Sequence, residues 1–125
     1  MSVTGLQVEQ ELVGEVLILR LSGELDVYTA ATLREKADAA LRSSGARAVV
    51  LACRHLAFLD STGLGVILGR FRWLQERGGR MALAGATGRV RTVLEVSGVS
   101  RLIPVFDSER KAVAALGGQA GREVG

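Results

Sequence analysis

Residues 58–70 read FLDSTGLGVILGR, and this stretch decides the fold. Six mostly apolar residues, Ala48–Cys53, precede it and predict a buried strand that leads into a short turn. Apolar side chains recur after it at helical spacing, at Leu64, Ile67, Leu68, Phe71 and Leu74. Residues 60–62 therefore stand at the start of a predicted helix, where backbone N–H groups are unpaired and the helix dipole is positive. A hydroxyl at this place can cap the helix or carry a phosphate.

The first turn of this helix has an unusual composition. Asp60, Ser61 and Thr62 are all residue types that cap helices, so capping is the simplest interpretation. Asp60 alone supplies one cap, which leaves both hydroxyls available. Gly63 and Gly65 each weaken the turn by about 1 kcal/mol relative to alanine, and we interpret them as room for the backbone of a partner. Local inconsistencies of this kind tend to lie at functional sites.

The rest of the chain alternates predicted strands and helices. We expect further strands at Leu6–Gln10, Val16–Leu21, Met81–Ala84 and Leu102–Val105, and helices at about 28–42, 61–77, 87–96 and 108–116. Pro104 indicates that the last strand lies at an edge. The pattern predicts one α/β domain, residues 1–125, with a four- to five-stranded, mostly parallel mixed sheet, an N-terminal hairpin and four helices. Its core spans about 5–117, and a flexible tail is expected at 118–125.

A second loop is expected beside the first. Ser22–Asp26 follows the strand Val16–Leu21 as the turn before Ser61 follows its own strand. The carboxyl ends of parallel strands lie at one edge of a sheet, so Asp26 and Ser61 are expected to share a surface. Two interpretations of Asp26 remain open, a cap for the helix near Tyr28 and a recognition residue, and one residue can serve both.

Composition argues against several classes of protein. The net charge is +3, but the arginines are scattered between acidic residues and form no basic stripe, which disfavours nucleic-acid binding. No apolar run approaches the roughly 20 residues of a membrane span, and the first residues do not resemble a signal peptide, so we expect a cytoplasmic protein. We expect Cys53 to be an inert buried thiol and His55 a partly exposed turn residue, and these two do not make a zinc site. No phosphate loop, dinucleotide motif or hydrolase elbow is present, so we expect no catalysis by the chain, no cofactor and no metal. We expect a monomer, because the apolar faces are used up by sheet and helix packing and no further apolar stripe remains for a dimer.

These residues resemble the anti-sigma factor antagonist family of STAS-domain proteins, most closely its sporulation members in endospore-forming bacteria. The likeness covers about residues 5 to 117. It is carried by Leu21–Asp26 (LSGELD), by residues 58–70, by Gly78-Gly79 and by Ser97-Gly98-Val99. One departure is Thr62, where the sporulation members carry a second serine, although threonine is common there across the wider family.

The resemblance implies a regulatory phosphoprotein of a partner-switching system, which is itself no enzyme. It implies that the unphosphorylated form binds a nucleotide-bound anti-sigma factor that is also a serine kinase, which releases the sigma factor for transcription. The kinase then phosphorylates Ser61, and a metal-dependent serine phosphatase restores the active form. The family's partner-contacting positions correspond to a set in both loops: Gly23, Glu24, Asp26, Asp60, Ser61, Thr62, Gly63 and Gly65.

Other functions remain open at this point. A member of the same family acting in general stress control or in a signalling assembly is the nearest alternative to sporulation. A ligand-binding STAS-like module or the cytoplasmic part of an anion transporter is another. An acyl carrier protein would also present a serine after an aspartate at a helix start, but carriers are acidic helical bundles, whereas this chain is basic and rich in strands.

Overall fold

The computed structural model describes residues 5–124, with side chains described to Gly117. A five-stranded mixed sheet has the order β1-β2-β3-β4-β5. Its strands are β1 (Leu6–Val13), β2 (Val16–Leu25), β3 (Ala48–Leu59), β4 (Arg80–Ala84) and β5 (Val105–Phe106). The helices are α1 (Ala30–Ser44), α2 (Ser61–Glu76), α3 (Gly88–Val96), α4 (Val99–Leu102) and α5 (Glu109–Val124). β1 pairs antiparallel with β2, and the other pairs are parallel. The predicted α/β class, mixed sheet and N-terminal hairpin are confirmed.

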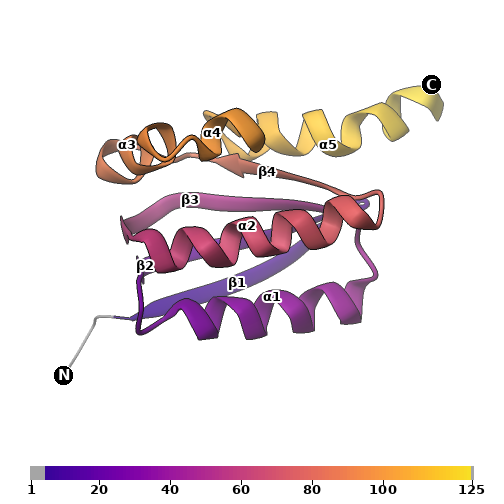
Figure 1. The fold of residues 1–125 in the computed structure, drawn as a ribbon. Coiled ribbons are helices and arrows are strands. Elements are labelled where there is room, and N and C mark those ends of the chain that lie inside the picture. Colours follow the sequence, from indigo (N-terminus) through magenta and orange to yellow (C-terminus); the bar gives the residue numbers. More distant parts are fainter. Residues whose placement is uncertain (1–4, 125) are drawn as a thin grey trace.

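The sheet is buried on both faces because its central strands are continuously apolar. One face packs against α1, α2 and α3 through side chains such as Leu19, Leu51 and Ile67. The other face is covered by α5, where Ala112 packs against small residues that include Ala82. Small side chains allow this helix to approach the sheet closely. Figure 1 shows α5 at the β4 side and α1 and α2 alongside the sheet.

Two strands extend into segments that the sequence assigned to a loop or a turn. β2 continues to Leu25 and β3 to Leu59, where we expected a loop after Leu21 and a turn after Cys53. Glu24 pairs with Phe58, and Leu25 with Leu59, after register shifts in the β2–β3 pairing. Irregularities of this kind change the direction of side chains without ending a strand. Arg54 and His55 are exposed and lie on β3, not in a turn. The expectation that His55 is a turn residue is wrong.

The C-terminal third also differs from the expectation. The strand predicted at Leu102–Val105 is only Val105–Phe106, although it does lie at the sheet edge, and a fifth, short helix, α4, precedes it. α5 continues to Val124, whereas the sequence predicted that the helix ends at Leu116 and that a tail begins at residue 118. A Cβ on Gly117 would lie 2.7 Å from Val16 Cγ2. Gly117 therefore permits close packing against β2 and does not end the helix.

An ion-pair network links α5 to the N-terminal hairpin. Arg20 Nε donates to Glu109 Oε2 at 2.8 Å, and Arg20 Nη2 donates to Glu109 Oε1 at 2.9 Å. The same guanidinium lies 2.7 Å from Glu11 Oε1. The hydrogen bonds from Arg20 hold the pKa of Glu109 below its ordinary value, and those to Glu109 and Glu11 raise the pKa of Arg20. The network joins β1 and β2 to α5, the first and last elements of the fold.

Candidate functional site

The two predicted loops meet at one edge of the sheet. The Asp60 backbone N–H donates to the Leu25 carbonyl at 3.2 Å, where β2 and β3 both end. Asp26 follows the acceptor residue and Ser61 follows the donor residue, so the predicted shared surface is confirmed. In Figure 1 this edge lies at the left, where α1 and α2 both begin. We call it the carboxyl edge.

Asp60 is the N-cap of α2, as predicted. Its carboxylate Oδ1 accepts a hydrogen bond from the Gly63 N–H at 3.0 Å, and its carbonyl accepts the first helical bond, from Leu64, at 2.9 Å. Ser61 and Thr62 are both exposed. Neither hydroxyl makes a hydrogen bond with any of the side chains or backbone groups of residues 5–117. The helix start therefore does not depend on the Ser61 hydroxyl, which is open to chemistry.

Gly63 and Gly65 have different explanations. A Cβ on Gly63 would lie 2.6 Å from Leu25 Cγ and 2.9 Å from the Leu25 carbonyl oxygen. The interpretation of Gly63 as room for a partner is therefore corrected: it allows α2 to start tightly against the end of β2. A Cβ on Gly65 would meet no atom within 4 Å, and Gly65 is exposed. Nothing inside the described part of the molecule requires a glycine there.

Asp26 caps the turn that enters α1. Its Oδ1 accepts from the backbone N–H of Tyr28 at 2.9 Å and of Thr29 at 3.1 Å. Its backbone carbonyl accepts from Ala30 at 2.9 Å. The other carboxylate oxygen, Oδ2, makes no hydrogen bond with residues 5–117, and the side chain is half-buried. The expectation that Asp26 is the N-cap of this helix is corrected, because Thr29 is the N-cap of α1 and Asp26 caps the turn just before it. One oxygen of the charged group remains available at the carboxyl edge.

Gly23 and Glu24 hold the N-terminal strand in place. Gly23 has a φ of +107°, and a Cβ there would overlap the Gly5 carbonyl oxygen. The same carbonyl accepts a hydrogen bond from the Glu24 N–H at 2.8 Å. Gly23 is thus required by the backbone, and half-buried Glu24 lies beside it in β2. Of the predicted contact residues, Ser61, Thr62 and Gly65 are exposed, and all three lie in the first turns of α2.

A shallow hollow of about 390 Å³ adjoins Ser61. Its lining comes from the end of β3, the start of α2 and the second half of α3. The lining residues are Leu59, Asp60, Ser61, Leu64, Thr92, Val93, Val96 and Ser97. The α3 members were not predicted. Val96 is 82% exposed, because it lies away from the buried positions Val90 and Leu94 of its helix. An apolar residue outside the helical stripe was the signal in the sequence that identifies this side of the site.

Other candidate chemistry is distant from Ser61 or buried. Cys53 is buried, and burial raises the pKa of its thiol to about 12, so the thiolate nucleophile is scarce at neutral pH. No group of three or more His, Cys, Asp or Glu side chains in the described residues could hold a metal ion. None of the helices within 5–124 is long and apolar enough to cross a membrane.

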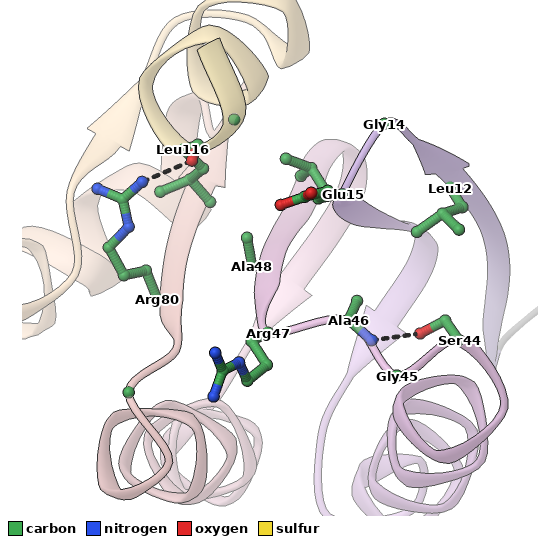
Figure 2. A pocket seen from close by; sticks show the side chains of 13 residues that line it. Leu12, Gly14, Glu15, Ser44, Gly45, Ala46, Arg47, Ala48, Arg80 and Leu116 are labelled. Carbon is green, nitrogen blue, oxygen red and sulfur yellow. Dashed lines mark hydrogen bonds between the residues drawn. The ribbon is translucent and has the colours of Figure 1, made fainter. Parts of the chain in front are cut away.

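Another cavity of about 390 Å³ lies at the opposite edge of the sheet, between the hairpin tip and the ends of α1 and α2. Figure 2 shows Arg80 there, bonded to the Leu116 carbonyl of α5. Arg47 donates to the Arg77 carbonyl at 3.2 Å. Both guanidinium groups therefore stabilise helix backbone. Leu12 lines this cavity and is 52% exposed, far from the carboxyl edge along the strands.

Comparison with known proteins identifies relatives along most of the chain. The family model described as STAS domain matches residues 7–112. An anti-sigma F factor antagonist of Paenibacillus polymyxa is 40% identical over 111 residues, which cover 89% of this chain and 95% of that protein. An anti-sigma-B factor antagonist of Bacillus subtilis is 32% identical over 87 residues, covering 70% of this chain and 78% of that protein.

Solved structures of SpoIIAA are also similar. The anti-sigma factor antagonist SpoIIAA in its unphosphorylated form is 30% identical with a TM-score of 0.75, and the match covers 90% of this chain and 96% of that chain. The Bacillus cell fate determinant SpoIIAA in its phosphorylated form is 29% identical with a TM-score of 0.66, covering 88% and 97%.

Proposed function

The chain belongs to the STAS domain family, and we propose that it is an anti-sigma factor antagonist switched off by phosphorylation of Ser61. In this role the unphosphorylated form binds an anti-sigma factor that is also a serine kinase, and the sigma factor is released for transcription in the cytoplasm. The names of the relatives support antagonism. The observation that carries the proposal is the exposed Ser61 hydroxyl, which the cap by Asp60 leaves unused.

The position of Ser61 suits a reversible phosphate. Ser61 and Thr62 are the first residues of α2, and their N–H groups belong to the unpaired positive end of the helix. Such ends bind phosphate readily, so the modified protein is expected to remain folded. The phosphate adds a charge of about −1.5 to −2 next to Asp60 and on the edge that holds Asp26. The surface that faces the partner therefore changes its charge while the fold stays the same.

The chain supplies the acceptor, and the partner enzymes supply the chemistry. The Ser61 oxygen attacks the γ-phosphorus of ATP bound to the kinase, its proton passes to a base of the kinase, and ADP leaves. Hydrolysis by a metal-dependent serine phosphatase breaks the new P–O bond with water and returns the hydroxyl. Asp60 stays hydrogen-bonded to Gly63 N–H throughout and holds the start of α2 in place.

The process controlled is proposed to be sporulation. The sigma F antagonist is 40% identical to this chain over most of its length, whereas the sigma B antagonist is 32% identical over fewer residues. A role in the general stress response is the alternative that the second relative favours.

The proposal is tested by incubating the chain with ATP and the anti-sigma kinase of its own organism. Mass spectrometry should locate one phosphate on Ser61. Ser61→Ala should remain unmodified and bind the kinase persistently. Thr62→Ala is the matched control, because Thr62 is the adjacent exposed hydroxyl, and it should still be phosphorylated. Phosphate on Thr62 alone, or no phosphate on the wild-type chain, contradicts the proposal.

A further inference from the structure

The hollow beside Ser61 is unfilled by the protein's own described side chains. Its apolar wall is formed by Leu59 and Leu64, which are 3% and 9% exposed, together with Val93 and Val96 of α3. Asp60 and Ser61 form part of the same wall. The acceptor residue therefore lies at the rim of an apolar depression.

Folding does not account for Val96. α3 buries Val90 and Leu94, whereas Val96 is 82% exposed and its side chain stabilises no core cluster. Valine is also a weaker helix former than the common polar residues, so helix stability does not favour it at this position. Val27 and Tyr28, which directly follow Asp26 at the same edge, are 60% and 89% exposed. Apolar side chains are thus presented to solvent next to both predicted loops.

We propose that the anti-sigma kinase inserts an apolar side chain into the hollow between α2 and α3, so that Val96 contributes to partner binding. This inference rests on the proposed function and extends its contact surface to α3. A typical protein interface covers about 800 Å² on each partner, which is a disc of roughly 16 Å radius. Such a disc centred on Ser61 contains the hollow, because Ser61 is one of the residues that line it.

The chemistry of the wall determines the occupant. Phosphoryl transfer requires the kinase to enclose the Ser61 hydroxyl and to exclude water around it. A polar or charged kinase group placed over Leu59, Leu64 and Val96 would lose its water against the apolar part of the wall. An apolar side chain removes all of these surfaces from water together.

The test measures affinity for the anti-sigma kinase loaded with a non-hydrolysable ATP analogue, using Val96→Glu and Val96→Ala in the full chain. We expect Val96→Glu to weaken binding at least tenfold and Val96→Ala about threefold, the range of moderate interface contacts. Leu12→Glu is the matched control, since it places the same charge on an exposed apolar position at the opposite edge. It should bind within about twofold of the wild type.

Phosphorylation kinetics add a second measurement and separate the two proposals. With ATP, Val96→Glu should raise the KM for the chain while the kcat for Ser61 phosphorylation stays near that of the wild type. Wild-type affinity and KM for Val96→Glu would overturn the inference, and so would an equal loss for Leu12→Glu. Failure of the wild-type chain to be phosphorylated on Ser61 would instead refute the proposed function. Circular dichroism and thermal unfolding of each variant report whether it is folded.

Discussion

Gly65 gives the sharpest prediction about the site, because stability and binding should respond in opposite directions. Gly65→Ala adds a methyl group that meets no atom within 4 Å, at an exposed position inside α2. Alanine in a helix interior is more favourable than glycine by about 0.5–1 kcal/mol. With an unfolding entropy of about 2.1 cal/mol/K per residue, the Tm of this chain should rise by about 2–4 °C.

Binding should become weaker although the protein is more stable. Gly65 lies one helical turn after Ser61 on the same side of α2, about 6 Å along the axis. A kinase that encloses Ser61 must therefore approach the backbone at Gly65. Gly69→Ala is the matched control, since a Cβ there also meets no atom within 4 Å and lies another turn away from Ser61. It should raise the Tm similarly and affect binding less.

The assay combines thermal unfolding with titration calorimetry against the nucleotide-loaded kinase. We expect Gly65→Ala to bind at least tenfold more weakly than the wild type, a change of about 1.4 kcal/mol. Wild-type affinity for Gly65→Ala would refute the reasoning that this glycine provides room for the partner. A fall in Tm would refute the conclusion that no part of the protein itself occupies the space.

Three further predictions concern packing, capping and pH. Gly63→Ala should destabilise the protein by about 1–3 kcal/mol, because its Cβ would clash with Leu25; unchanged stability in urea titration would contradict this. Asp26→Asn keeps the Oδ1 acceptor but removes the charge, so calorimetry should show weaker partner binding while the free energy of unfolding stays nearly unchanged. Asp26→Ala removes the acceptor as well and should also lower the free energy of unfolding, measured by urea titration, by about 1 kcal/mol. If Asp26→Asn binds the partner normally, Asp26 is only a cap. The hydrogen bond from Arg20 lowers the pKa of Glu109 in the folded protein from its ordinary value of 4.5. The ion pair therefore stabilises the fold above pH 4.5, and this stabilisation is lost as the pH falls through the folded pKa. At pH 7 the wild type should have a free energy of unfolding about 1 kcal/mol higher than that of Glu109→Gln. The free energies of the two proteins, measured by urea titration, should become equal in acid. A difference that persists at pH 2 would exclude the Arg20–Glu109 pair as its cause.

Local chemistry allowed the centre of the site to be predicted from the sequence. The apolar run Ala48–Cys53 and the cap at Asp60 depend on neighbouring residues, and both are confirmed. The shared edge of Asp26 and Ser61 followed from the topology of parallel strands and is also confirmed. Whether Ser61 is phosphorylated and which residues contact a partner stay predictions.

The remaining features depend on contacts between residues distant in sequence. Arg54 and His55 resemble turn residues, but β3 passes through them because Glu24 pairs with Phe58 farther along. Gly63 shows the same limitation, since the need for a glycine comes from Leu25 across the sheet edge. A sequence pattern identifies that a glycine is unusual without indicating which neighbour requires it.

The C-terminal helix shows a third case. Gly117 and Gly118 are typical of a helix end, yet α5 runs on to Val124. The close approach of Gly117 to Val16 becomes visible only when α5 is packed on the sheet. Tertiary packing here outweighs the local preference of glycine to end helices.

The central claim is that a phosphate on Ser61 abolishes partner binding through local charge and bulk. The most direct measurement is titration calorimetry of the unmodified and the Ser61-phosphorylated chain against the same nucleotide-loaded anti-sigma kinase, with thermal unfolding confirming that both forms are folded. The account predicts at least 100-fold weaker binding of the phosphorylated form, which requires only about 2.7 kcal/mol. Like charges brought together at an interface can supply several kcal/mol. Equal affinities of the two folded forms would contradict the account.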